Sequence, residues 1–341
     1  MTIIQKPAET EFTGRMCDLV IDSDKTIDVE VRYNGKAVVS EKYSPDASNV
    51  IRLRRLHNLC NLCMWGRSLG YLGEQDTAAG VFSFYADGAQ VAQSTLYYSA
   101  FMRRQSPMEL GVFTDCPKRS TYRGAPELAT GIPMTRTNSE GVTEYYAHIE
   151  ATLSDDSQVS GEKLLFMAGS VRYAYTLSVS VEDVESYLGV SGVVEYSIGF
   201  TGGSCLFRVE EFPIEDVGSL RFRNLYDMPE IAHFTGGCSL SAANESETAE
   251  VSGVRRKFDI KVNDEYKVSS GGISFGSEYR LWRDLCNSSE VEIWSEEYGW
   301  VPVTITKHKL EIDAFRKEFK EAELTLTIAE QRMNGLNDIL I

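Results

Sequence analysis

Apolar and polar residues alternate along much of the chain, in short runs that end at turn-forming residues. A period of two is typical of half-buried β-strands. The clearest example runs from Val29 to Val39, where Asn34 and Gly35 supply the positive φ angles that a two-residue hairpin turn requires. Three more hairpins are predicted over residues 81–98, 193–210 and 291–306, with turns at Asp87-Gly88, Gly202-Gly203 and Tyr298-Gly299. Four hairpins predict antiparallel sheets.

Three segments have the period of a helix instead. These are Leu53 to Met64, Val181 to Leu188 and Ser277 to Asn287. Gly189 is suited to end the second helix, and Ser277 to cap the third, whose apolar stripe is Leu281, Trp282 and Leu285. Each segment follows a strand and precedes a hairpin, so the chain shows a threefold strand, helix, hairpin pattern. Low residue identity between the copies leaves duplication and chance arrangement both open.

A chain of 341 residues exceeds the size at which one core usually keeps growing. The pattern predicts a mainly β protein of several antiparallel β-sandwich or barrel domains with short flanking helices. We expect an N-terminal β domain at 13–102, a basic, proline-rich linker or long loop at 103–142, a second β domain at 143–225 and a C-terminal β domain with one helix at 226–335.

The segment from Arg103 to Gly141 lacks the strand rhythm and is basic within an acidic chain. Its cations predict a docking surface for a neighbouring acidic subunit, with a solvated loop as the alternative. The docking residues would be Arg103, Arg104, Lys118, Arg119 and Arg123. A second stretch, Ser241 to Ser252, is rich in small and polar residues and is expected to be an exposed turn or insertion.

The formal charge of −16 repels nucleic acid and anionic lipid, so neither sequence-specific nucleic-acid binding nor membrane insertion is expected. The N-terminus has no apolar stretch of the signal-peptide kind, which predicts synthesis in the cytoplasm. Seven cysteines, an odd number, favour reduced and mostly buried thiols. Leu56, Cys60 and Cys63 share one helical face, which favours core packing over a metal or redox role.

Candidate catalytic and metal motifs are weak. Residues 272–276 match G-x-S-x-G around Ser274, but a nucleophile elbow lies at the top of a parallel sheet and this region is predicted to be antiparallel. The only later histidine, His308, falls in a predicted strand rather than on a loop. The histidines are too far apart for a metal pair, and Asp22, Asp24 and Asp28 lack the glycine of a calcium loop. The four tryptophans are expected to pack in cores, Trp294 and Trp300 across a hairpin, with sugar stacking as the alternative. No catalytic residue, metal or cofactor is therefore predicted.

Segments near both ends of the chain carry a family resemblance. The N-terminal ones are Gln5-Lys6-Pro7, Val29 to Glu41, Tyr43 to Ala47 and Val50 to Leu53. The C-terminal ones are Tyr266 to Gly271, the helix with Trp282 and Leu285, Val291 to Trp294, Trp300 to Thr306 and Glu323 to Ala329. Together they cover about half of the chain. They resemble tail-associated structural proteins of phages and prophages of gut Bacteroidales and, more loosely, distal-tail and baseplate-hub proteins.

The resemblance implies a non-enzymatic protein of the virion tail. Its partners would be other tail or baseplate proteins, and it would form a homo-oligomeric ring whose sheets continue from subunit to subunit. The main alternative is a carbohydrate- or receptor-binding module, either a tail receptor-binding protein or a surface adhesin. An enzyme such as a tail hydrolase ranks third.

Overall fold

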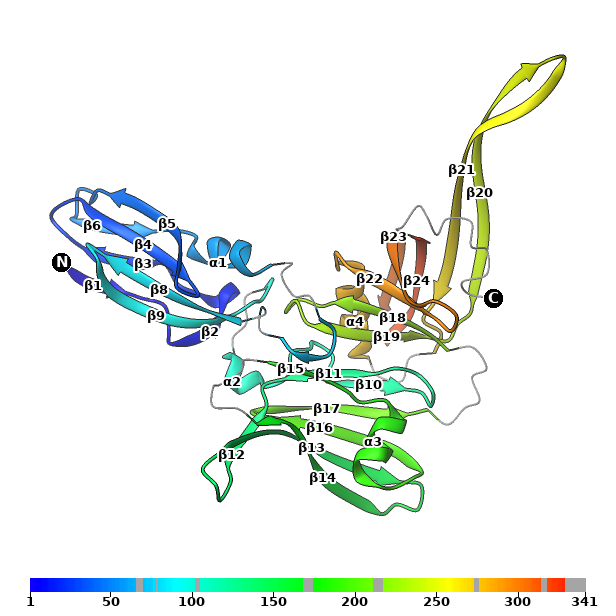
Figure 1. The fold of residues 1–341 in the computed structure, drawn as a ribbon, viewed down its shortest axis with the longest axis horizontal. Helices are drawn as coiled ribbons and strands as arrows, with labels where there is room; N and C mark the ends of the chain where they lie inside the picture. Colours follow the sequence, from blue (N-terminus) through cyan, green and yellow to red (C-terminus); the bar gives the residue numbers. More distant parts are fainter. Residues whose placement is uncertain are drawn as a thin grey trace.

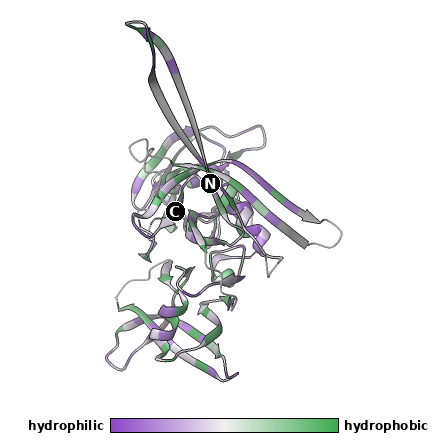
Figure 2. Ribbon diagram, turned by 90° about the vertical axis from the view of Figure 1, so that its right-hand side faces the viewer, coloured by the Kyte–Doolittle hydropathy of each residue, from purple (hydrophilic) through white to green (hydrophobic). Residues whose placement is uncertain are grey.

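The computed structural model describes residues 1–65, 70–75, 77, 79–101, 105–167, 174–210, 217–272, 276–313 and 318–328. Strands make up 56% of the chain and helices 12%, so the fold is mainly β with several antiparallel sheets and few short helices, as predicted. Figure 1 shows three lobes, with a long two-stranded arm projecting from the third. Figure 2 shows hydrophobic and hydrophilic residues alternating along many of the strands.

The first lobe packs two sheets and a helix around one core. Its elements are β1 (Thr2–Gln5), β2 (Thr10–Phe12), η1 (Thr13–Arg15), β3 (Leu19–Asp22), β4 (Ile27–Tyr33), β5 (Lys36–Tyr43), β6 (Val50–Leu53), α1 (Leu56–Met64), β8 (Ala79–Ala86) and β9 (Ala89–Tyr97). The sheet orders are β1-β3-β6 and β2-β9-β8-β4-β5. The hairpin turns Asn34-Gly35 and Asp87-Gly88 have positive φ at both residues, as predicted. Helix α1 begins later than predicted because Leu53 ends β6 and Arg55 takes a left-handed conformation.

The middle lobe also has two sheets and a helix around one core. Its elements are β7 (Gly73–Glu74), α2 (Pro107–Leu110), β10 (Lys118–Thr121), β11 (Leu128–Gly131), β12 (Met134–Thr137), β13 (Thr143–Leu153), β14 (Gln158–Met167), β15 (Tyr175–Ser178), α3 (Val181–Leu188), β16 (Val193–Phe200) and β17 (Gly203–Val209). One sheet has the order β10-β17-β16-β13-β12, with β14 also paired to β13, and the other has the order β11-β15-β7. Helix α3 has the predicted bounds, and Gly189 follows it with φ +67°.

The predicted linker at 103–142 is wrong, because α2, β10, β11 and β12 lie within it. Strands β10 and β11 have four residues each and are almost wholly buried, so neither shows the alternation that marks a half-buried strand. The start of α2 carried a readable signal. Ser106 and Glu109 form a capping box, with Pro107 in the first turn.

The C-terminal lobe is one seven-stranded sheet covered by a helix. Its elements are β18 (Gly218–Arg223), β19 (Pro229–Phe234), β20 (Cys238–Val251), β21 (Val254–Ser269), α4 (Glu278–Cys286), β22 (Val291–Ser295), β23 (Gly299–Asp313) and β24 (Glu318–Ile328). The order is β19-β18-β22-β23-β24-β21-β20. The predicted helix stripe of Leu281, Trp282 and Leu285 is buried in the core.

Two domain boundaries differ from the prediction. The first lobe already contains β1 and β2, before residue 13, and β18 belongs to the C-terminal sheet although it precedes residue 226. The first boundary was misplaced because β1 and β2 are short. The second was misplaced because β18 pairs with β22, which lies far along the chain.

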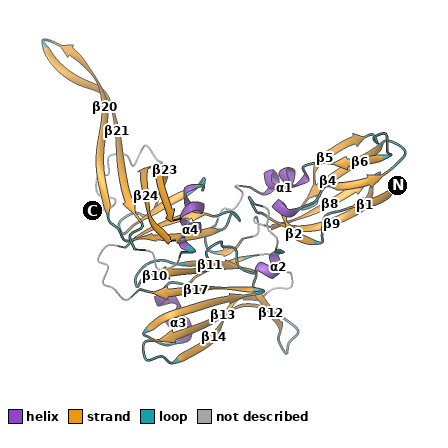
Figure 3. Ribbon diagram, turned by 180° about the vertical axis from the view of Figure 1, so that it is seen from behind, coloured by secondary structure: helices purple, strands orange, loops and turns teal. Residues whose placement is uncertain are grey.

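The predicted threefold pattern has a structural counterpart. Helices α1, α3 and α4 each follow a strand and precede the hairpins β8–β9, β16–β17 and β22–β23 (Figure 3). The large sheets of the first two lobes share one topology, β2-β9-β8-β4-β5 and β10-β17-β16-β13-β14, and the edge pairs β2–β9 and β10–β17 are both parallel. The third sheet differs, since the outer neighbour of β23 is the antiparallel β24. The shared order supports duplication for the first two lobes.

Side chains from all three lobes meet in a separate aromatic cluster. Phe12 and Tyr97 come from the first lobe, Phe113 from the middle lobe and Tyr226 from the C-terminal lobe. The rings of Tyr97 and Phe113 stack with centroids 5.5 Å apart, and those of Phe12 and Tyr226 are also 5.5 Å apart. Such contacts add to the hydrophobic free energy of burial, so this cluster ties the lobes together.

Candidate functional site

The arm is the least supported element of the fold. Strands β20 and β21 pair along its whole length, from Cys238 opposite Val268 to Val251 opposite Val254. Strand β24 pairs with β21 only from Glu265 to Ser269. Beyond that base the arm is a ribbon of two strands, which stands clear of the lobes (Figure 1). A two-stranded hairpin without a third strand or a core is only marginally stable in water.

The tip of the arm is exposed, and one of its two strands, β21, carries basic residues there. Ser252 and Gly253 have φ of +55° and +78° and form the turn. Val251 and Val254 beside the turn are 50% and 54% exposed. The next three residues of β21, Arg255 to Lys257, are all exposed cations. Residues 241–252, expected to be a turn or insertion, are thus mostly strand, and the Ser252-Gly253 dipeptide was the overlooked hairpin signal.

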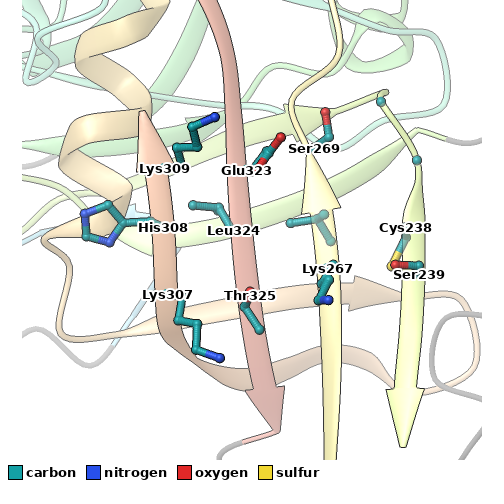
Figure 4. A pocket seen from close by; sticks show the side chains of 13 residues that line it. Cys238, Ser239, Lys267, Ser269, Lys307, His308, Lys309, Glu323, Leu324 and Thr325 are labelled. Atoms are coloured by element: carbon teal, nitrogen blue, oxygen red, sulfur yellow. The ribbon is translucent and has the colours of Figure 1, made fainter. Parts of the chain in front are cut away.

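A hollow of about 630 Å³ lies at the foot of the arm, on the sheet formed by β20, β21, β24 and β23 (Figure 4). Lys267 and Lys307 both pair in register with Thr325, one on each side of it, and Lys307 Nζ lies 3.8 Å from Glu265 Oε1. Lys309 lies opposite Glu323 in a neighbouring register position. Lysines and hydroxyls on an open sheet face can bind a polar or anionic group. We call this hollow the arm-base groove.

The large sheet of the middle lobe has an exposed face on which acidic side chains take the place of the lysines of the arm-base groove. Along β13, Ala147, Ile149 and Ala151 are buried in the core that α3 covers, so the residues between them lie on the other face. A hollow of about 320 Å³ on that face is lined by Glu150 and Glu195 together with neutral residues, and no basic side chain lines it. We call this surface the acidic face.

A buried charged network joins the middle and C-terminal lobes. Arg119 of β10 donates from Nη1 to Glu230 Oε1 of β19 at 2.5 Å, and from Nη2 to Glu127 Oε1 at 3.0 Å and the Leu128 carbonyl at 2.8 Å. The side chains of Arg119, Glu127 and Glu230 are 4%, 0% and 3% exposed. Burial opposes the charge on Arg119, but the two carboxylates outweigh it and raise the pKa of the guanidinium. Arg119 therefore holds two sheets together.

The same network contains a serine, a histidine and a glutamate in series. Ser219 Oγ lies 2.9 Å from His233 Nδ1, and His233 Nε2 lies 3.1 Å from Glu127 Oε2. Ser219 is 2% exposed, and the cavity beside His233 measures about 20 Å³, room for about one water. A ligand pocket is usually 300 Å³ or more. These contacts thus link strands β18 and β19 to the middle lobe. Among the described residues, the cavity beside them is too small to hold a substrate.

The predicted docking residues do not form one surface. Lys118 is exposed at the start of β10, whereas Arg119 is buried, which corrects its place on a docking surface. Arg123 is half exposed and donates to Glu185 Oε1 at 3.0 Å. Arg103 and Arg104 lie outside the described residues. Polarity alone misled the prediction, because a buried arginine with two carboxylates has the same sequence signature as an exposed one.

The other candidate residues occupy structural positions, except Ser274, which lies outside the described residues. His308 is mid-strand in β23, as predicted, and Trp294 pairs with Trp300 across the hairpin with ring centroids 5.2 Å apart. Trp282 packs in the C-terminal core, but Trp65 and Trp294 are 54% and 40% exposed, so core packing was wrongly expected for these two. Cys60 and Cys63 are buried and are not joined by a disulfide, and burial raises the pKa of Cys60. Ser277 precedes α4, but its hydroxyl donates to the Lys118 carbonyl and does not cap the helix.

Within the described ranges, no group of three histidine, cysteine or acidic side chains could hold a metal ion. In the same part of the chain, no helix has the length and apolar character needed to cross a membrane. No protein-family model and no curated protein matches the sequence.

Proposed function

We propose that this chain is a non-enzymatic structural subunit of a phage or phage-like tail or baseplate, which acts in the virion by assembling with copies of itself and with other tail proteins. The observation that carries the proposal is the arm. A ribbon that lacks a third strand beyond Glu265 gains stability when a partner covers it.

The open edges of the sheets add support. Strands β5, β14 and β20 end their sheets and leave backbone groups on one side without a strand partner among the described residues. Proteins usually block such edges with lysine, proline or bulges. Strand β20 contains no proline and no basic residue, and its first seven residues are uncharged. This edge is suited to pair with another strand, while the charge of −16 keeps free subunits apart until they meet partners.

The test is the size and shape of the purified protein in solution. We expect light scattering after size-exclusion chromatography to give a defined multiple of 38.1 kDa, and negative-stain images to show rings. A protein that stays monomeric at micromolar to millimolar concentration, alone and with neighbouring tail proteins, would rule out the proposal.

A carbohydrate- or receptor-binding module is the second candidate, favoured by the arm-base groove. Its lysines and hydroxyls could bind an acidic sugar. A glycan array separates the two functions, because an assembly subunit should give no signal. A reproducible signal that Lys267→Ala abolishes, with the fold intact by circular dichroism, would favour the binding module.

A further inference from the structure

We infer that the arm of one copy docks across the acidic face of the next copy, so that Arg255 and Lys257 meet Glu150 and Glu195. The inference deepens the proposed function and rests on it. It names the partner of the arm as a second copy of this chain, and it names the surface that the arm contacts.

The two surfaces cannot meet within one chain. The arm starts from the edge of the C-terminal sheet and points away from the middle lobe in both Figure 1 and Figure 3. From Ser241 to the turn the arm rises about 35 Å, at roughly 3.3 Å per residue. Four strands of the middle sheet span about 19 Å at roughly 4.8 Å per strand. One arm is therefore long enough to cross the acidic face of another copy.

The charges of the two surfaces are complementary. Glu150 is exposed and Glu195 half exposed, and no basic side chain lines their hollow. Glu150 has His148 beside it, 3.3 Å away, and Arg208 lies opposite Glu195 in the neighbouring strand, so some positive charge already borders the face. The chain has a net charge of −16, but three consecutive exposed cations lie at the arm tip. These cations are complementary in charge to the carboxylates of the acidic face.

Register places alternate residues of the tip on opposite faces of the ribbon. Arg255 lies opposite Glu250, and Lys257 lies opposite Thr248. Arg255 and Lys257 therefore share one face, and Arg256 lies on the other. That face of the arm therefore carries two cations and one carboxylate, Glu250, and it can bring the two cations to the two carboxylates of the acidic face.

Arm and acidic face are different patches of the same chain, so their contact is heterologous. Repeated contacts of this kind close into a ring, or grow as a filament if the rotation does not close. A heterologous contact also has a signature that a two-fold contact lacks. Two variants, each defective in a different patch, can still join through their remaining intact patches.

The experiment uses an arm variant, a face variant, their combination in one chain and a control, all full-length and measured by light scattering after size-exclusion chromatography. The arm variant is Arg255→Glu with Lys257→Glu, and the face variant is Glu150→Lys with Glu195→Lys. A charge-matched control for the arm variant is Arg52→Glu with Arg54→Glu, at exposed positions of the first lobe. Circular dichroism and thermal melts check that all four fold.

We expect each of the first two variants to fall to the monomer mass and the control to assemble like the unmodified protein. An equimolar mixture of arm and face variants should assemble as well, because the intact arm meets the intact face and the reversed arm meets the reversed face, each with opposite charges. All four substitutions in one chain should restore the larger assembly.

Two results would overturn the inference. One is an arm variant that assembles like the unmodified protein, which would leave the proposed function standing. The other is a mixture that stays at the monomer mass although each variant alone is monomeric, which would place the arm on another surface. If the unmodified protein forms no assembly with itself or with tail proteins, the proposed function fails as well.

Discussion

Replacing Arg119 with methionine tests whether the buried network holds the middle and C-terminal lobes together. The substitution keeps much of the side-chain volume but removes the cation that faces Glu127 and Glu230. Each of the three hydrogen bonds of the guanidinium is of the charge-assisted kind, worth about 1.5–3 kcal/mol before compensation. Thr114 and Asn224 still donate to Glu230 after the change, which limits the loss. We expect a loss of about 3–5 kcal/mol in the free energy of unfolding, the usual result of breaking a buried ion pair.

Arg136 provides a matched control, because it also contacts two carboxylates, those of Glu144 and Glu162. Its side chain is 50% exposed, so solvent screens its ion pairs and Arg136→Met should cost much less than Arg119→Met. Both losses are measured by urea unfolding. Tryptophan fluorescence suits the assay, because three of the four tryptophans (Trp282, Trp294 and Trp300) lie in the C-terminal lobe.

Equal losses for the two variants would refute the reasoning, since burial would then not decide the cost. A triple variant, Arg119→Met with Glu127→Gln and Glu230→Gln, should recover part of the loss. It removes the two carboxylates that the single substitution leaves buried without their cation.

Three further outcomes are expected. Gly111→Ala should lower the melting temperature more than Gly35→Ala, because both residues have positive φ but only at Gly111 would the new Cβ overlap backbone of the β16–β17 turn. Mass spectrometry after brief iodoacetamide treatment should find Cys238 modified first, since it is the one exposed thiol of seven, all of which lie in the described part of the chain. The hydrogen bond from Arg123, followed by those from backbone amides, holds the pKa of Glu185 below its ordinary value. At a pH above that ordinary value the ionised carboxylate stabilises the fold. This stabilisation is lost as the pH falls through the lowered pKa. The stability difference between the unmodified protein and Glu185→Gln should accordingly be present at pH 7 and vanish in acid, as thermal melts across pH would show.

Local signals were read correctly where a single residue type dictates the backbone. Asn34-Gly35 and Asp87-Gly88 have positive φ at both residues because a tight hairpin demands it, and Gly189 ends α3 for the same reason. The cross-strand contact of Trp294 and Trp300 follows from counting residues around a turn. These features depend on neighbours in the sequence.

The candidate surfaces could not be read in this way. The acidic face requires knowing which side of β13 the helix α3 covers, and the arm-base groove brings together Lys267 of β21 and Lys307 of β23, strands separated in the chain by α4 and β22. The arm was missed because its residues are small and polar. Strand propensity there is overridden by pairing with the opposite strand.

By itself the sequence determined the mainly β class, the four hairpins, and the helices α1, α3 and α4 with their order, because periodicity and turn chemistry act over a few residues. Tertiary structure alone decided which charges are buried and which strands lie at edges. Arg119 belongs to the interior only because β10 packs beside β17 and faces β19, contacts between residues far apart in the chain. The free energy of a charge depends on its surroundings, so no local pattern could separate that buried arginine from the exposed ones near it.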